Sequence, residues 1–175
     1  MNNKLELRMY GLVNYQLTGI QMGIQFSHAL TEYSLENFHS DDYQNWADLH
    51  KTVILLNGGT TNNNPDKLGT LNQHLTTLQE KGIVNAFFNE PDLGEQLTAV
   101  VFIVDERVFN KEKYPDFVFT NQTQKTPGYG MWSNDPLKPE FLNENEAKRW
   151  EEWVNSIGGE TNLWLRFWLK NFRLA

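Results

Sequence analysis

The 175-residue sequence contains no cysteine, which excludes disulfide bonds, thiolate zinc sites and a cysteine nucleophile. Its four histidines are scattered, and no two of them have the H-x-x-x-H spacing that is typical of metal ligands. We therefore expect neither a metal nor another resident cofactor.

Long apolar runs are also absent. No stretch reaches the length of about 20 residues that a membrane-spanning helix needs, and the first residues lack the apolar run of a signal peptide. These absences predict a cytoplasmic protein without a membrane partner.

Positive charge is scarce in the first part of the chain. Residues 1–104 contain five lysines and arginines against eleven acidic residues, whereas residues 105–175 contain ten against eleven. With a formal net charge of −7, the chain lacks a generic basic surface for nucleic acid. A local basic segment follows Glu160, where Arg166, Lys170 and Arg173 have no acidic neighbour in the sequence.

Hydrophobic residues make up 39% of the chain, which is enough for one folded domain with a core. After residue 104 prolines accumulate, and five of the six tryptophans follow residue 131. We expect an α/β domain over residues 1–104, with residues 105–175 forming an extended segment and two Trp-rich helices packed on it. Thr161 is the expected N-cap of the last helix.

Alternating and apolar segments predict four strands, at residues 5–14, 51–56, 83–88 and 97–104. Helical spacing predicts helices between them, at residues 18–35, 41–50 and 68–81. This order implies parallel strands joined by right-handed crossovers and a final antiparallel hairpin. The expected fold is a single three-layer α/β/α domain with a mixed four-stranded sheet, in which 51–56 is the clearest buried strand.

The first predicted helix begins at Thr18. Its apolar spacing suggests that Ile20, Ile24, Leu30 and Tyr33 face the sheet, and Gly19 and Gly23 would permit a close approach.

Gln21, Gln25 and His28 fall close to one line along this helix, beside the end of a strand, where α/β domains usually keep a polar site. Gln21 and Gln25 can hold an amide or a water by hydrogen bonds from two sides. His28 can act as a general base or contact a substrate phosphate. The alternative for His28 is a structural role, packed under the helix and bonded to the backbone.

Small polar residues follow the second predicted strand, at Asn57, Gly58, Gly59 and Thr60. Free N–H groups there could bind an anion ahead of a helix. The segment lacks the lysine of a P-loop, and the alternative is a plain turn that ends the strand.

The turn before the last strand contains Glu90-Pro91-Asp92, and Thr98 opens that strand. Because Pro91 disfavours helix at the preceding residue, Glu90 should be extended, and the two carboxylates can activate a water or bind a hydroxyl. The alternative is a turn with solvated acids. If the strand ends share one edge of the sheet, these residues converge with those of the first helix.

Over roughly residues 5–104 the chain resembles the type 2 peptidyl-tRNA hydrolases of archaea and eukaryotes, in a divergent form such as phage or bacterial genomes carry. The resemblance rests on the order of strands and helices, on Trp46 before the second strand, and on the run G-x-x-x-G-x-Q-x-x-H-A at residues 19–29. Gln25, His28 and Ala29 match the family pattern G-K-x-A-A-Q-x-x-H-A. The family's lysine falls on Gln21.

The resemblance implies hydrolysis of the ester that joins a peptide to the terminal ribose of tRNA. Glu90 or Asp92, the nearest equivalents of the family's hairpin aspartate, would orient the attacking water, and Gln21, Gln25 and Thr98 would place the ester. His28 would support the site. The expected partner is peptidyl-tRNA, and an apolar terminal helix in a family that often pairs favours a homodimer.

The missing lysine favours an alternative, in which a catalytically impaired scaffold serves as a protein-binding or nucleotide-binding module. A hydrolase that acts on a small nucleotide ester is a third hypothesis.

Overall fold

The computed structural model describes residues 4–119 and 144–175, which divide into two compact units. The first unit runs up to Glu106 and includes Phe172–Ala175, and the second comprises Arg107–Asn171. The expected boundary after residue 104 lies just before this division. The end of the chain, which the sequence assigned to the appendage, belongs to the first unit.

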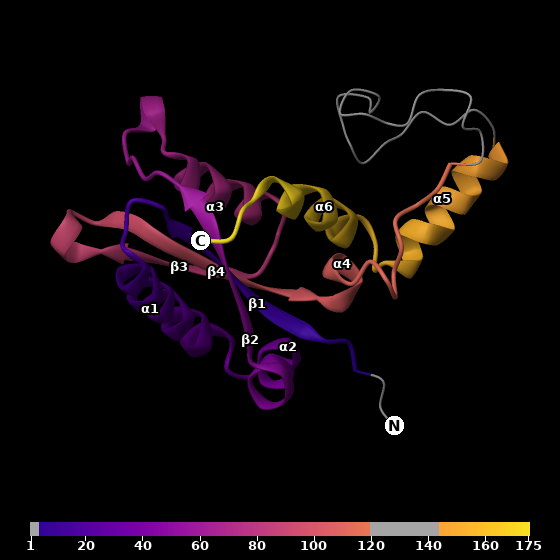
Figure 1. The fold of residues 1–175 in the computed structure, drawn as a ribbon, viewed down its shortest axis with the longest axis horizontal. Coiled ribbons are helices and arrows are strands. Elements are labelled where there is room, and N and C mark those ends of the chain that lie inside the picture. Colours follow the sequence, from indigo (N-terminus) through magenta and orange to yellow (C-terminus); the bar gives the residue numbers. More distant parts are fainter. Residues whose placement is uncertain (1–3, 120–143) are drawn as a thin grey trace. The chain divides into compact units, whose positions relative to one another are not determined.

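A mixed four-stranded sheet forms the first unit, in the order β2-β1-β4-β3 (Figure 1). Its strands are β1 (Leu7–Asn14), β2 (Thr52–Gly59), β3 (Asn85–Glu90) and β4 (Gln96–Asp105). Strand β1 pairs parallel with β2 and antiparallel with β4, which also pairs antiparallel with β3. The carboxyl ends of β1, β2 and β3 therefore lie at the same edge as the start of β4. The expected mixed sheet and final hairpin are confirmed.

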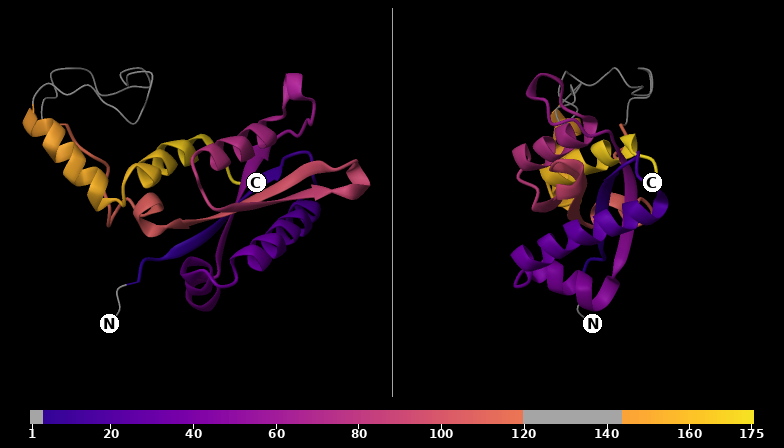
Figure 2. Two further views of the ribbon diagram at one scale, coloured as in Figure 1. Left: turned by 180° about the vertical axis from the view of Figure 1, so that it is seen from behind. Right: turned by 90° about the vertical axis from the view of Figure 1, so that its left-hand side faces the viewer.

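Helices cover both faces of this sheet. They are α1 (Gly19–Asn37), α2 (Asp41–Asn45), the π-helical turn Trp46–His50, α3 (Thr70–Glu80) and the 3-10 turns Pro65–Lys67 and Pro91–Leu93. Figures 1 and 2 show α1 and α2 on one face and α3 on the other. The fold is thus of the α/β class. Gly82 follows the end of α3, with a φ of +66°.

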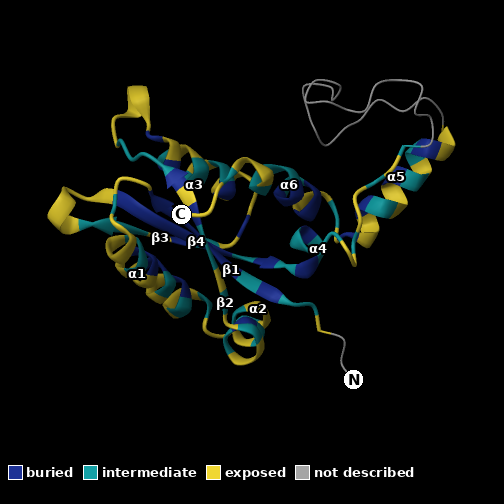
Figure 3. Ribbon diagram, in the orientation of Figure 1, coloured by how far each residue is buried: buried dark blue, intermediate teal, exposed yellow. Residues whose placement is uncertain are grey.

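The two central strands form most of the core (Figure 3). Met9 and Leu12 of β1 and Val100 and Phe102 of β4 are all completely buried. Only Leu56 and Gly58 of β2 are buried, because this strand lies at the side of the sheet and pairs with β1 alone. The expectation that it would be the clearest buried strand is therefore wrong.

Two β-bulges interrupt the sheet at the edge where β1, β2 and β3 end and β4 begins. Between β1 and β2 the register passes from Val13↔Asn57 to Asn14↔Gly59, which leaves Gly58 as an extra residue. Between β3 and β4 it passes from Phe88↔Ala99 to Asn89↔Leu97, which leaves Thr98 extra. Bulges redirect side chains and are frequent beside active sites. Strand β2 also continues through residues 57–59, where the sequence suggested that it would end.

The start of α1 matches the expectation, since Thr18 caps it in a capping box with Gln21. The buried face differs in part: Ile20 is 81% and Ile24 49% exposed, whereas Tyr33 is buried as expected and Leu30 packs against the core. The buried residues of α1 are Gln25, Phe26, Ala29 and Tyr33.

A missing side chain in β1 explains this choice of face. A Cβ atom on Gly11 would lie 2.4 Å from a ring carbon of Phe26, so the glycine makes room for the ring. Gly19 and Gly23 have nothing within 4 Å of such an atom, so they do not provide the close approach that was expected of them.

The end of the chain protects the free edge of β2. Leu174 forms an antiparallel bridge with Leu56. The N–H of Asn57 donates to the carbonyl of Arg173 at 2.9 Å, and the N–H of Ala175 donates to the carbonyl of Leu55 at 3.0 Å. Covering an edge strand in this way blocks its pairing with another chain.

The second unit contains α5 (Glu144–Ser156), α6 (Glu160–Trp168) and the 3-10 turn Leu169–Asn171, and the short α4 (Glu106–Phe109) spans the division. Trp150, Val154, Ile157 and Leu163 form its buried cluster. Helix α6 is capped by Gly159, with a φ of +91°, so Thr161 lies inside the helix and is not its cap. The paired glycines at 158 and 159, both with positive φ, allow the chain to reverse before that threonine.

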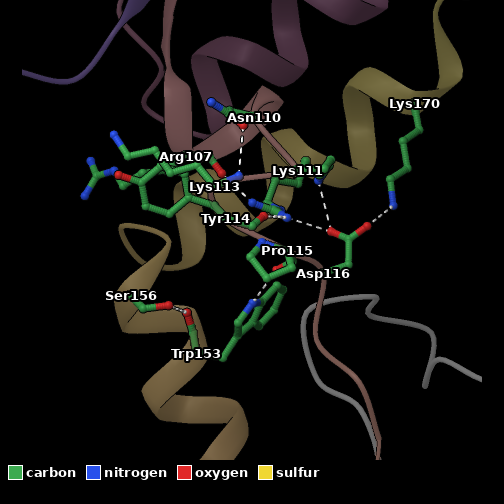
Figure 4. Close-up of polar contacts among 11 residues, drawn as sticks. Arg107, Asn110, Lys111, Lys113, Tyr114, Pro115, Asp116, Trp153, Ser156 and Lys170 are labelled. Carbon is green, nitrogen blue, oxygen red and sulfur yellow. Dashed lines mark hydrogen bonds and ion pairs between the residues drawn. The ribbon is translucent and has the colours of Figure 1, made fainter.

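Arg166 is buried in this unit, with 2% exposure. Its guanidinium donates to the backbone carbonyl of Arg107, to that of Tyr114 at 2.8 Å and to the carboxylate of Asp116 at 2.7 Å. Lys111 and Lys170 approach the same carboxylate at 3.0 and 3.6 Å (Figure 4). Burial alone would raise the pKa of Asp116, but the hydrogen bonds from Arg166 and Lys111 and the neighbouring positive charges lower it from 3.8 to about 2.

Within residues 4–119 and 144–175, no helix combines the length and the apolar character that crossing a membrane requires.

Deletion of residues 173–175 should expose the edge of β2. We expect the free energy of unfolding to fall by about 1–3 kcal/mol, since two backbone hydrogen bonds are lost, and the amide of Asn57 to lose its protection from hydrogen exchange. Leu174→Ala is the control, because this side chain is 76% exposed and the substitution leaves both backbone bonds in place. Unchanged protection of Asn57 in the deletion variant would contradict the role assigned to the chain end.

Asp116 should make stability depend on pH. Its pKa is lower in the folded state than the ordinary 3.8, so the ionised group stabilises the fold above about pH 4, and this contribution is lost as the pH falls toward 2. Urea unfolding of the wild type and of Asp116→Asn at several pH values measures it. The difference in unfolding free energy should shrink between about pH 4 and 2, and a difference that stays constant would refute the assignment.

Candidate functional site

Gln25 of α1 lies at the centre of a polar group at the bulged edge of the sheet. Its Nε2 donates to Oε2 of Glu90 at 2.5 Å, and its Oε1 accepts from the hydroxyl of Thr98 at 2.7 Å. Because one partner is a carboxylate and the other a hydroxyl donor, the orientation of the amide is fixed. Three residues that the sequence singled out on separate elements are therefore in direct contact.

Thr98 owes its position to the bulge in β4. It is 1% exposed, and its hydroxyl also lies 3.1 Å from the carbonyl oxygen of Phe88 on the paired strand. As the extra residue of the bulge, Thr98 leaves the regular alternation of the strand, and its hydroxyl meets Gln25 on the α1 face.

Glu90 ends β3 in an extended conformation, with φ −83° and ψ 112°, as the following proline predicts. Its Oε1 accepts from the N–H of Asp92 at 3.4 Å and caps the short helix that follows. A carboxylate can accept about four hydrogen bonds, so Glu90 can also hold a water or a substrate hydroxyl. Asp92 is exposed in that turn, and the structure brings Glu90, not Asp92, to Gln25.

His28 lies one turn after Gln25 on α1. It is exposed, and its ring stacks on that of Phe88 with 4.6 Å between the centroids. The alternative in which His28 packs under the helix is therefore wrong. The imidazole lies beside the strand that supplies Glu90, at a position that solvent and a ligand can reach.

Gln21 does not join this group. Its side-chain oxygen accepts from the N–H and from the hydroxyl of Thr18, at 3.0 and 3.1 Å, as part of the capping box. Although Gln21 and Gln25 are one turn apart, Gln21 is exposed and directed to the start of the helix.

The segment from Asn57 to Thr60 differs from the expected anion site. The N–H of Asn57 is bonded to the chain end, that of Gly59 donates to the side chain of Asn57 at 2.9 Å, and that of Thr60 donates to Thr70 at 2.9 Å. These three N–H groups are not free, so the expectation is wrong for them. Gly58 serves packing, since a Cβ there would lie 2.6 Å from Leu71.

Sequence reasoning missed Asn14 and Thr61. The buried amide of Asn14 donates to the hydroxyl of Thr61 at 3.0 Å, and this hydroxyl donates to the carbonyl of Leu97 at 2.5 Å. The two residues thus hold the start of β4 next to Thr98. A polar residue at the end of the apolar β1 was a visible signal for Asn14, whereas nothing in the local sequence distinguished Thr61.

The site is negatively charged. No lysine or arginine occurs between Arg8 and Lys51, so α1 carries no positive side chain, and Glu90, Asp92 and Glu95 surround the hairpin. In the described part of the chain, no group of three or more histidine, aspartate or glutamate side chains is placed to hold a metal. The available chemistry is that of a carboxylate, an amide and a hydroxyl.

A comparison with protein-family models and one with curated protein sequences each found no match to this chain.

Gln25→Leu should destabilise the protein more than Gln21→Leu does. The first substitution removes the side-chain donor to Glu90 and the side-chain acceptor of Thr98, which should cost about 1–3 kcal/mol. The second removes an exposed capping contact and should cost up to about 1 kcal/mol. Urea unfolding of both variants measures the difference. Equal losses would show that the buried amide has no special role in stability.

Proposed function

We propose that the protein is an ester hydrolase of the type 2 peptidyl-tRNA hydrolase kind. One observation carries the proposal: the amide of Gln25 lies between the carboxylate of Glu90 and the hydroxyl of Thr98. The resemblance places the family's glutamine on Gln25, and its nearest equivalents of the hairpin acid and threonine are Glu90 or Asp92 and Thr98. The contacts join residues of α1, β3 and β4, and this proximity supports the proposal independently of the sequence pattern.

In the proposed reaction Glu90 accepts a proton from a bound water while the water oxygen bonds to the ester carbonyl carbon. The bond from that carbon to the ribose oxygen then breaks, and the proton passes to the leaving oxygen. Gln25 fixes the orientation of the carboxylate, and Thr98 fixes Gln25. His28, exposed on the neighbouring turn, is available to contact the substrate.

Glu90, rather than Asp92, is the proposed water-orienting group. Only Glu90 of these two carboxylates bonds to Gln25 in the described part of the chain. Substitution of each carboxylate in turn therefore tests whether Glu90 or Asp92 orients the water.

A second candidate function is a binding module for a protein or a nucleotide-like ligand. Gln21 favours it, since the position of the family's lysine holds a neutral side chain that takes part in the capping box. A lysine there would add positive charge for the developing oxyanion and for phosphate. Hydrolysis of a small nucleotide ester remains a third hypothesis, which would appear as ligand-dependent stabilisation without tRNA binding.

Incubation of the purified protein with peptidyl-tRNA tests the first candidate. We expect release of the peptide, with a loss of at least about 100-fold in rate for Glu90→Gln, in line with the usual contribution of a general base. Asp92→Asn is the matched control and should remain within a few-fold of the wild type. No cleavage at high enzyme concentration would exclude the hydrolase, and equal losses in both variants would exclude Glu90 as the single base.

Gln21→Lys separates the two candidates further. If the remaining site is competent, the added lysine should raise the cleavage rate; a protein that is only a binding module should stay inactive. Peptidyl-tRNA as the partner, a homodimer and a cytoplasmic location are parts of the same proposal that await measurement.

A further inference from the structure

The second unit contains three cationic side chains around one carboxylate. Asp116 pairs with Arg166 at 2.7 Å, Lys111 at 3.0 Å and Lys170 at 3.6 Å. Among the residues that the structure describes, Asp116 is the only acid paired with these cations. One negative charge against three positive charges leaves a surplus of positive charge at this cluster.

The cations repel one another. Burial lowers the pKa of Lys111 most, the hydrogen bond and charge of Asp116 oppose this effect, and the charges of Arg166 and Lys170 lower the pKa further. An additional anion at the cluster would relieve this repulsion, as Asp116 already does in part.

Arg166 is a fixed element of the cluster. Two backbone carbonyls and Asp116 hold its guanidinium, whose centre lies 5.6 Å from the ring centroid of Trp153. Among the described residues, its buried Nε has no hydrogen-bond partner. The guanidinium is therefore held in place by its other nitrogens, and its positive charge stays next to Asp116.

The two lysines are accessible. The side chains of Lys111 and Lys170 are 38% and 48% exposed, and Figure 4 shows both ammonium groups directed at Asp116. Each ammonium has three donors. That of Lys111 gives one to the carboxylate at 3.0 Å, whereas that of Lys170 only forms an ion pair with it at 3.6 Å, so donors on both lysines can bind a ligand. Compact ammonium groups with N–H donors to spare suit the oxygen atoms of a phosphate.

We propose that Lys111 and Lys170, supported by Arg166 and Asp116, form a binding site for a phosphate group. Asp116 keeps the two lysines together, and their remaining donors bind the phosphate oxygens. The site lies within the second unit and does not rest on the proposed hydrolase activity. The phosphate is supplied either by free phosphate ions or by the backbone of RNA.

Titration of the full chain with inorganic phosphate at low ionic strength tests the proposal, with the ε-CH₂ signals of the lysines followed by NMR. We expect saturable shifts at Lys111 and Lys170. Lys111→Gln and Lys170→Gln should each weaken binding roughly fivefold or more, because each removes a unit charge a few ångströms from the anion. Lys148→Gln, an exposed lysine of α5, is the control and should bind like the wild type.

A second arm uses a single-stranded RNA oligonucleotide. If RNA supplies the phosphate, its affinity should fall in the two lysine variants but not in Lys148→Gln, and the salt dependence should decrease with each lysine removed. If RNA does not bind while inorganic phosphate does, the site serves free phosphate. Shifts that do not saturate, or affinities equal in all four proteins, would overturn the proposal. Circular dichroism establishes that each variant is folded.

Discussion

Strand β4 lies between β1 and β3 and pairs antiparallel with both, and this placement determines where the polar groups of the first unit meet. With β2 parallel to β1, three strands end at the edge where β4 begins. The two β-bulges occur at that edge, at Gly58 and Thr98, so the regular alternation of side chains is interrupted there on both sides of the sheet's centre. Gln25 can therefore contact Glu90 and Thr98, from which 65 and 73 positions of the sequence separate it.

The contacts of Gln25 link stability to site geometry. A buried amide without partners would cost about 1–3 kcal/mol, and its two bonds avoid that cost while they fix α1 against β3 and β4. The same bonds hold the carboxylate of Glu90 in one orientation with free acceptor capacity. Electrostatic catalysis usually requires groups that are already in place before the reaction. The proposed site meets this requirement, because Glu90 needs no reorganisation before it can position a water. Asn14 and Thr61 form a separate pair of hydrogen bonds, which reaches the carbonyl of Leu97, the residue before Thr98.

Charge is organised differently in the two units. The first unit presents carboxylates at its candidate site and no positive side chain on α1, whereas the second gathers three cations around Asp116. The proposed ester substrate suits the first kind of chemistry, and the proposed phosphate ligand suits the second. Each site nevertheless depends on its own contacts, and either one can exist without the other.

The sequence by itself determined the order of strands and helices, the start of α1 at Thr18 and the extended backbone of Glu90, because local periodicity, capping and proline sterics control these features. It also identified Gln25, Glu90 and Thr98 as candidates. Only the tertiary structure decided that Phe26, and not Ile20, faces the sheet, since the space above Gly11 arises between layers. Only pairing between distant segments decided that Glu90 rather than Asp92 meets Gln25, that Thr61 supports β4, and that the N–H groups of residues 57, 59 and 60 are occupied.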